Sequence, residues 1–224
     1  MSNMSLHNIK AVITAGPTRE YLDPIRYLTN VSSGKQGYAI AAALQRYGAQ
    51  VKLISGPVAL AEIPGVQMVH IETAQQMYDE LASSLPADLV ICNAAVADFR
   101  PAHTHLQKIK KQAGVDEYQL ELVKNLDLLK YVSSLQKGRP NLVIGFAAET
   151  ENLLANAQKK LANKQCDWIL ANDISAQNQV IGYDHNQIIF MNEDQIEHWP
   201  RMTKASIAEH LLAKIINYFH SVSK

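Results

Sequence analysis

The chain has 224 residues, and its 21 lysines and arginines equal its 21 aspartates and glutamates. This balance excludes a broad basic or acidic field, so we expect no nucleic-acid partner and no anionic membrane partner. No apolar run is long enough to cross a membrane, and the N-terminal residues MSNMSLHNIK lack the apolar core of a signal peptide. We therefore expect a soluble, cytoplasmic protein whose residues 1–224 form one α/β domain.

The cysteines give no sign of a disulfide or a metal site. Cys92 and Cys166 both fall in apolar stretches and share no CxxC spacing. The nearby His103 and His105 lack a third ligand at a suitable spacing. These features predict buried, reduced thiols and ordinary loop histidines.

A strand–helix–strand unit opens the chain. Ala11–Ala15 and Val51–Ser55 are apolar runs that each end at a Gly-Pro pair, and they predict two buried strands. Between them, apolar residues at helical spacing predict a helix from Tyr38 to Tyr47 that Gly48 ends. Such a crossover makes the two strands parallel neighbours.

The connection from Gly16 to about Val31 is much longer than the usual βα loop of about 2–6 residues. It contains several polar or charged residues and closes with the sequence SSGKQG. A serine N-cap followed by glycine leaves backbone N–H groups exposed, and the helix dipole adds positive charge. Ser33 and Gly34 are therefore expected to bind a phosphate. The alternative is a plain serine cap without a ligand. Neither the Rossmann glycine fingerprint nor the Walker pattern is present.

Strands and helices alternate along the rest of the chain. Strands are predicted at 66–71, 88–93, 141–146 and 167–171; helices are predicted at about 73–85, 125–136 (capped by Asn125), 151–163 and 204–218. This alternation predicts an α/β fold with an open, mostly parallel, Rossmann-like sheet and helices on both faces.

Two stretches interrupt this alternation. Residues 102–124 predict a β-hairpin flap with strands Leu106–Lys111 and Tyr118–Val123 around Gly114-Val115-Asp116. Residues 178–200 predict a second β excursion with a turn near 192–194. The lysines of the flap can belong to a solvated edge strand or to a mobile, cationic flap over a phosphate, and both readings stay open.

Polar groups follow three of the predicted strands at their carboxyl ends, where open α/β sheets bind ligands. They are the helix start at 32–37, the turn with Asp98, and the turn at Phe146–Glu149. We expect these groups to converge on one site. Lys160 and Lys164 share one face of the following helix, although spacing alone fits an ordinary solvated surface equally well.

Several motifs resemble one enzyme family, in the right order. ITAGPTRE, DPIRYLTNVSSGKQG, NAAVADFRP, KIKK, LVKNLDLL and GFAAET closely resemble bacterial phosphopantothenoylcysteine synthetase, over about Ile9 to Tyr218. In many bacteria this CTP-dependent phosphopantothenate–cysteine ligase is the C-terminal domain of a bifunctional coenzyme A biosynthesis protein. The flavin-dependent decarboxylase half is absent here, so we expect no flavin in this chain.

The resemblance implies a ligase that joins 4′-phosphopantothenate to L-cysteine. CTP would activate the acid as an acyl-cytidylate, with release of pyrophosphate and then CMP. The resemblance also implies Mg²⁺ or another divalent cation with unknown ligands, a homodimer, and a phosphopantothenoylcysteine decarboxylase in the same pathway. The implied catalytic residues are Asn30 and Lys108, and the implied contacts to the acyl-cytidylate are Arg26, Asn30 and Ala95. The implied contacts to CTP are Cys92, Asn93, Ala94, Asp98, Lys108, Phe146, Lys160 and Lys164.

Two other functions stay open on the residues alone. An NAD(P)- or nucleotide-binding oxidoreductase could use the same sheet, although the glycine fingerprint and its acidic partner are missing. A non-catalytic nucleotide sensor would keep the site at the helix start but would not require Asn30 or Lys108.

Overall fold

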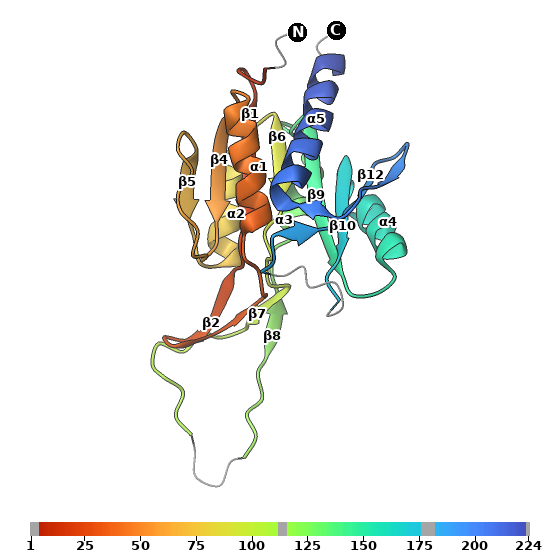
Figure 1. Cartoon of the computed structure of the whole chain (residues 1–224). Coiled ribbons are helices and arrows are strands. Elements are labelled where there is room, and N and C mark those ends of the chain that lie inside the picture. The colour runs from red at the N-terminus through yellow and green to blue at the C-terminus, as the bar shows by residue number, and fades with distance from the viewer. Residues whose placement is uncertain (1–4, 112–115, 176–181, 223–224) are drawn as a thin grey trace.

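The computed structural model describes residues 5–111, 116–175 and 182–222, and an eight-stranded sheet forms its centre (Figure 1). The parallel strands follow the spatial order β5, β4, β1, β6, β9 and β10, and the antiparallel β12 and β13 extend the β10 edge. The bounds are β1 (Lys10–Ala15), β4 (Gln50–Ser55), β5 (Gln67–His70), β6 (Leu89–Cys92), β9 (Leu142–Glu149), β10 (Trp168–Asp173), β12 (Ile189–Met191) and β13 (Ile196–His198). This order is that of a doubly wound nucleotide-binding sheet, which confirms the predicted fold class.

Helices cover both faces of the sheet. The helices α1 (Lys35–Arg46) and α5 (Lys204–Val222) pack on one face, and α2 (Ala74–Ser83), α3 (Leu128–Ser133) and α4 (Leu153–Lys164) pack on the other. Neighbouring residues of β1 therefore belong to different hydrophobic cores. Ile13 lies in the core with α1 and α5, and Val12 lies in the core with α2, α3 and α4. Burial on both sides explains why the strands appear in the sequence as continuous apolar runs.

Capping side chains mark the helix starts. The predicted cap of α2 is confirmed, because Thr73 Oγ1 accepts the Gln76 N–H at 3.2 Å and Gln76 Oε1 accepts the Thr73 N–H at 3.0 Å. The predicted cap of α3 by Asn125 is wrong. Asp127 is the N-cap and accepts the Lys130 N–H at 2.9 Å. The Asn125 side chain instead donates from Nδ2 to the Ala97 carbonyl at 2.8 Å, two positions before the cap.

A hairpin occupies much of the stretch that we predicted as a loop between residues 16 and 31. It pairs β2 (Arg19–Asp23) with the antiparallel β3 (Arg26–Thr29). Asp23 makes the turn, since its Oδ1 accepts the N–H of Ile25 at 3.0 Å and of Arg26 at 2.9 Å. The signal was present in the sequence, where an Asp-Pro turn separates two Tyr-Leu pairs.

An arm, residues 102–111 and 116–121, projects beside this hairpin (Figure 1). Only its base is regular, where β7 (Phe99–Pro101) pairs with β8 (Leu122–Lys124). The predicted strand Leu106–Lys111 is wrong, and residues 112–115 of the predicted turn lie outside the described residues. Leu106 is 93% exposed, so the arm has no core to pack against, and an unsupported two-stranded hairpin is marginal in water.

The second predicted β excursion is confirmed in its later part by β12 and β13. Asn192 makes their turn by accepting the N–H groups of Asp194 and Gln195. Upstream, β11 (His185–Asn186) pairs with β14 (Met202–Thr203) in a separate small sheet, and residues 176–181 lie outside the described part. A membrane-spanning helix is not found among the described helices.

Candidate active site

The candidate site lies where the strand order of the sheet reverses. β1 and β6 are neighbours in the sheet, but the chain continues from β1 outward to β4 and from β6 outward to β9, in the opposite direction. The connections therefore diverge at the carboxyl ends of β1 and β6 and leave a crevice between them. A cleft of about 960 Å³ opens there. Its walls come from the start of α1, the segment after β6, the start of α3, and the ends of β9 and α4.

The segment 93–97, directly after β6, forms a fixed wall of the cleft. The Ala94 N–H donates to Thr14 Oγ1 at 3.3 Å, and the Ala95 N–H donates to the Gly16 carbonyl at 2.9 Å. These bonds tie the segment to β1 and its following loop. Because both N–H groups are engaged, a ligand at this wall would meet carbonyl oxygens and side chains.

Asn30 lies at the edge of the cleft, between β3 and α1. Its Nδ2 donates to the Val96 carbonyl at 2.9 Å, across 66 positions of sequence. This bond holds the amide against segment 93–97. A carboxamide nitrogen carries two N–H groups, so one donor and the carbonyl oxygen remain for a ligand.

The helix α1 begins at the cleft, although its cap is not the predicted serine. Gly34 is the N-cap, with a φ of 71°, and no side chain caps the helix. Ser32 Oγ instead accepts the Gly34 N–H at 3.3 Å, so the prediction of a serine cap is wrong. Ser33 and Gly34 do line the cleft. Gly37 permits this close position, because a Cβ there would lie 2.6 Å from Ala15 Cβ.

Lys160 and Lys164 of α4 line the cleft beside Phe146 of β9. Burial, and then the positive charge of Lys164, lower the pKa of Lys160. Lys164 forms an ion pair with Asp127, the cap of α3. Burial alone would raise the pKa of Asp127, but hydrogen bonds from Lys164 and from the Lys130 N–H outweigh it and lower that pKa.

The two cysteines are free thiols, as predicted. Cys92 ends β6 and lines the cleft. Burial raises the pKa of Cys92 to about 12, so its thiol is neutral at physiological pH. A neutral, half-buried thiol is part of the cleft wall and is poorly suited to act as a nucleophile.

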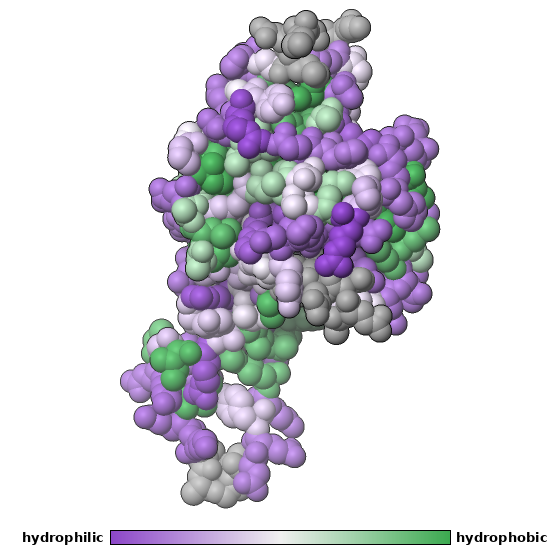
Figure 2. Space-filling model, viewed as in Figure 1, coloured by the Kyte–Doolittle hydropathy of each residue, from purple (hydrophilic) through white to green (hydrophobic). Residues whose placement is uncertain are grey.

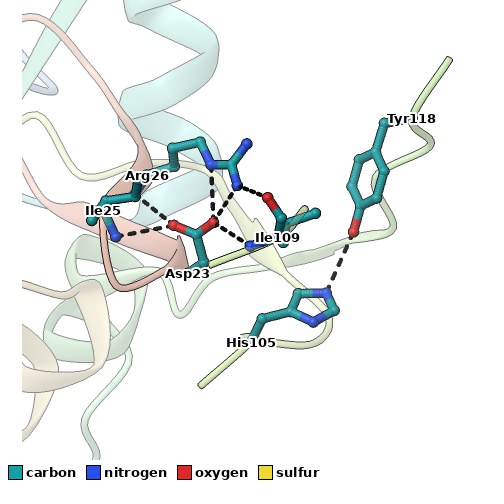
Figure 3. A network of polar contacts seen from close by, with 6 residues as sticks. All are labelled: Asp23, Ile25, Arg26, His105, Ile109 and Tyr118. Carbon is teal, nitrogen blue, oxygen red and sulfur yellow. Dashed lines mark hydrogen bonds and ion pairs between the residues drawn. The ribbon is translucent and has the colours of Figure 1, made fainter. Parts of the chain in front are cut away.

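Two predicted site residues, Arg26 and Lys108, lie outside the cleft lining. Figure 3 shows the contacts of Arg26 with Asp23 and Ile109. Arg26 Nε donates to Asp23 Oδ2 at 2.9 Å, and Arg26 also donates to the Ile109 carbonyl at 2.8 Å. Asp23 Oδ2 accepts the Ile109 N–H at 3.0 Å. The hydrogen bond from Arg26 is the largest influence that holds the pKa of Asp23 well below its usual value. These contacts join the hairpin to the arm, where Lys108 is exposed.

The cleft brings the other predicted site residues together from separate parts of the chain. They are Asn30, Ser33, Gly34, Cys92, Asn93, Ala94, Ala95, Asp98, Phe146, Lys160 and Lys164. Sequence reasoning did not assign several further polar lining residues to the site, among them Lys35, Asn172, Asn186 and Lys204. Lys35 belongs to the SSGK motif and could have been included. The other three follow no local pattern, because only the packing of distant elements turns them to the cleft.

The family described as the DNA/pantothenate metabolism flavoprotein C-terminal domain matches residues 6–219. The chain belongs to this family. The coenzyme A biosynthesis bifunctional protein CoaBC of Vibrio vulnificus (strain YJ016) is 41% identical over 211 residues, which cover 94% of this chain and 52% of that protein. CoaBC of Escherichia coli (strain K12) is 43% identical over 216 residues, which cover 96% of this chain and 53% of that protein. The chain thus spans about half the length of these relatives.

Solved structures agree with this family. The crystal structure of the C-terminal domain of CoaBC is 37% identical, covers 98% of this chain and 100% of that chain, and has a TM-score of 0.81. The DNA/pantothenate metabolism flavoprotein from Streptococcus pneumoniae is 27% identical, covers 94% of this chain and 99% of that chain, and has a TM-score of 0.79. The resemblance that the sequence motifs indicated is therefore confirmed.

Proposed function

We propose that this chain joins 4′-phosphopantothenate to L-cysteine with CTP, and so makes 4′-phosphopantothenoylcysteine for coenzyme A biosynthesis. The observation that carries the proposal is the cleft at the reversal of strand order, where Asn30, segment 93–97 and the Lys160–Lys164 pair meet. Its volume of about 960 Å³ suits a nucleotide together with a second substrate. Family membership supports the same chemistry, since the relatives are named for coenzyme A biosynthesis.

In the first half-reaction, the carboxylate of 4′-phosphopantothenate would attack the α-phosphorus of CTP. The bond from the α-phosphorus to the bridging oxygen breaks, pyrophosphate leaves, and the acyl-cytidylate forms. Cations must balance the charge of the triphosphate. Lys160 suits this task, because a half-buried ammonium with a lowered pKa is stabilised when an anion binds beside it. Lys108 would add a second charge from the arm.

In the second half-reaction, the amine of cysteine would attack the acyl carbonyl, and CMP would leave as the amide forms. Negative charge builds up on the carbonyl oxygen during this attack. The N–H group of Asn30 that is not bonded to Val96 can donate to that oxygen. One such donor is typically worth about 2.7–4 kcal/mol.

A divalent cation fits the carboxylates of the cleft. Mg²⁺ usually binds one or two carboxylates, together with substrate phosphates and waters. Asp98 and Asp127 line the cleft, and Asp127 is already paired with Lys164. No group of three or more His, Cys, Asp or Glu residues suited to a metal occurs in the described ranges. Asp98, whose carboxylate forms no ion pair with a described residue, would hold a magnesium ion that arrives with CTP, and that ion would neutralise phosphate charge.

The hairpin and the arm would form the interface of a homodimer. Ile25 is 59% exposed, Leu106 93% and Tyr118 61%. In Figure 2 hydrophobic residues gather in the upper part of this projection, and most of the arm below them is hydrophilic. Soluble monomers rarely expose such clusters. In a dimer, Arg26 and Lys108 of one copy can approach the cleft of the other, which would reconcile their proposed roles with their position outside their own cleft.

The proposed setting is the cytoplasm, where cysteines remain reduced, and both cysteines here are free thiols. There the product would pass to a phosphopantothenoylcysteine decarboxylase. The relatives that match this chain are named as bifunctional proteins, and the chain spans about half of their length.

Incubation with 4′-phosphopantothenate, CTP and Mg²⁺, with and without cysteine, tests the proposal. Without cysteine, we expect about one equivalent of pyrophosphate per site and retained acyl-cytidylate. With cysteine, CMP and the amide product should appear at every turnover, and CTP should exceed ATP in kcat/KM. A protein that binds CTP but releases no pyrophosphate would be a sensor. Hydride transfer to NAD(P)⁺ without pyrophosphate release would identify an oxidoreductase.

A further inference from the structure

One carboxylate connects the two predicted site residues that lie outside the cleft. Asp23, at the turn of the hairpin, is buried although it lies on the projection. Its Oδ2 accepts the N–H of Arg26 Nε at 2.9 Å and the Ile109 N–H at 3.0 Å (Figure 3). Ile109 directly follows Lys108 in the chain. A single oxygen atom therefore joins the side chain of Arg26 to the backbone that carries Lys108.

Arg26 completes a clamp, formed by Asp23, Arg26 and Ile109. Arg26 Nη2 donates to Asp23 Oδ2 at 2.5 Å and to the Ile109 carbonyl at 2.8 Å. Both backbone polar groups of Ile109 are thus held, the N–H by Asp23 and the carbonyl by Arg26. Hydrogen bonds between two charged partners are stronger than neutral ones, so the pair of Asp23 with Arg26 gives the clamp a defined geometry.

The two carboxylate oxygens of Asp23 have separate tasks. Oδ1 accepts the N–H groups of Ile25 at 3.0 Å and of Arg26 at 2.9 Å, and these bonds make the turn. Asparagine and serine side chains form the same kind of turn with one oxygen. A carboxylate at this position is therefore needed for the clamp and not for the turn.

The arm is otherwise weakly held near Lys108. Closer to its base, Thr104 Oγ1 donates to the Tyr21 carbonyl at 3.1 Å. Beyond that contact, Leu106 is 93% exposed, so no core lies beneath the chain where it approaches residue 108. An unheld lysine there would sample many positions, and a misplaced catalytic group slows a reaction. The clamp fixes the residue next to Lys108 and so restricts these positions.

We propose that Asp23 is a positioning residue of the first half-reaction: through the clamp on Ile109, it sets where Lys108 meets the triphosphate. The inference rests on the proposed function, which gives Lys108 a role in the release of pyrophosphate. Asp23 itself would not touch the substrate, because its oxygens serve the turn and the clamp. A lysine that is held in place before CTP binds lowers the entropy cost of ordering the arm during the reaction.

Asp23→Asn separates the clamp from the turn in the full chain. The asparagine keeps Oδ1 for the turn, but its amide N–H groups then face the donors of Arg26 and Ile109 and open the clamp. We expect pyrophosphate release to slow by about 10–10²-fold and the Ile109 amide to exchange its hydrogen faster. Asp23→Ser keeps a hydroxyl for the turn and lacks Oδ2. It should behave in the same way, and it decides the test if the asparagine variant does not fold.

A double-variant cycle distinguishes positioning from a general structural role. If Asp23 acts through Lys108, Asp23→Asn should slow pyrophosphate release much less in the Lys108→Gln background than in the wild type. Thr104→Val is the matched control. It removes another hydrogen bond between the arm and the hairpin and leaves the clamp intact, so it should release pyrophosphate at the wild-type rate.

Wild-type rates of pyrophosphate release in both Asp23 variants would overturn the inference. Equal fold losses from Asp23→Asn in the two backgrounds would also overturn it, because Asp23 would then act independently of Lys108. A loss in Thr104→Val as large as that in Asp23→Asn would show that any loosening of the arm has this effect, and would overturn it too. In these cases the proposed function stands, since the wild type releases pyrophosphate. A wild type that releases none would overturn the proposed function, and this inference with it.

Discussion

The cleft and the projecting hairpin and arm differ in how their residues are held. At the cleft, Asn30 is bonded to Val96, and segment 93–97 is bonded in turn to β1, so these candidate site groups are tied to the centre of the sheet. On the projection, Leu106 is 93% exposed. Hairpin and arm are joined by hydrogen bonds such as those from the Ile109 N–H to Asp23 and from Arg26 to the Ile109 carbonyl. Under the proposed function, the cleft would position the chemistry, whereas the projection would supply charge and apolar surface to a second copy of the chain.

Asn30→Asp should give the largest effect and should act on one half-reaction. An aspartate cannot donate to the carbonyl oxygen and repels the charge that develops there. We expect amide formation to slow by about 10²–10³-fold, while one equivalent of CTP is still consumed and acyl-cytidylate accumulates. Mass spectrometry of quenched reactions would detect the intermediate. Equal loss of both half-reactions in a folded variant that binds CTP would remove this role from Asn30.

Lys108→Gln should act on the first half-reaction instead. Loss of the flap charge is expected to slow pyrophosphate release by about 10²-fold, as measured in a phosphate-coupled assay. Lys110→Gln, on the same arm, is the control and should retain activity. If acyl-cytidylate formed at the normal rate in Lys108→Gln, the lysines of the arm would be surface charge only.

Mixing two inactive variants locates the cleft on which Lys108 acts. In a dimer of one Lys108→Gln chain and one Asn30→Asp chain, one cleft has both native residues only if Lys108 serves the neighbouring copy. We expect partial recovery of activity after the two variants are mixed and allowed to exchange subunits. No recovery would place Lys108 over its own cleft and require the arm to move there.

A pair of leucine substitutions contrasts the two regions in stability. Leu44 of α1 is fully buried, so Leu44→Ala should lower the free energy of unfolding by about 2–5 kcal/mol. Leu106→Ala should leave the free energy of unfolding of the monomer unchanged and should weaken the dimer, because no core of the same chain covers this residue. Urea unfolding and analytical ultracentrifugation measure the two effects. A large loss of monomer stability in Leu106→Ala would show that the arm packs on its own chain.

The smallest effect concerns the ion pair of Asp127 with Lys164. The folded pKa of Asp127 is lowered, so the pair stabilises the fold above the unfolded pKa of about 3.9 and ceases to do so as the pH falls through the folded value. Asp127→Asn keeps a capping side chain, and it should cost less than about 1 kcal/mol at pH 7 because the pair is partly exposed. The difference in melting temperature should shrink below about pH 4. A difference independent of pH would rule out the charge as its origin.

Local patterns in the sequence predicted the sheet and most of its helices. Strands buried on both faces, such as β1, appear as continuous apolar runs, and the cap of α2 at Thr73 depends on residues three positions apart. The resemblance located most of the candidate site, because its motifs follow the carboxyl ends of the strands. The hairpin of β2 and β3 was missed although its Asp-Pro turn was visible, since a long polar connection was taken for a loop.

Tertiary structure alone decided which of these residues meet. The bond from Asn30 to Val96 and the bond from the Ile109 N–H to Asp23 join positions that no periodic pattern connects. Arg26 and Lys108 belong to the same family motifs, yet they lie on the projection and not in the cleft. A sequence pattern reports burial and capping within a few residues, whereas the position of a side chain relative to a distant one depends on how whole helices and strands pack. For that reason the sequence determined the sheet and its ligand-binding edge, and only the fold separated the residues of the cleft from those of the arm.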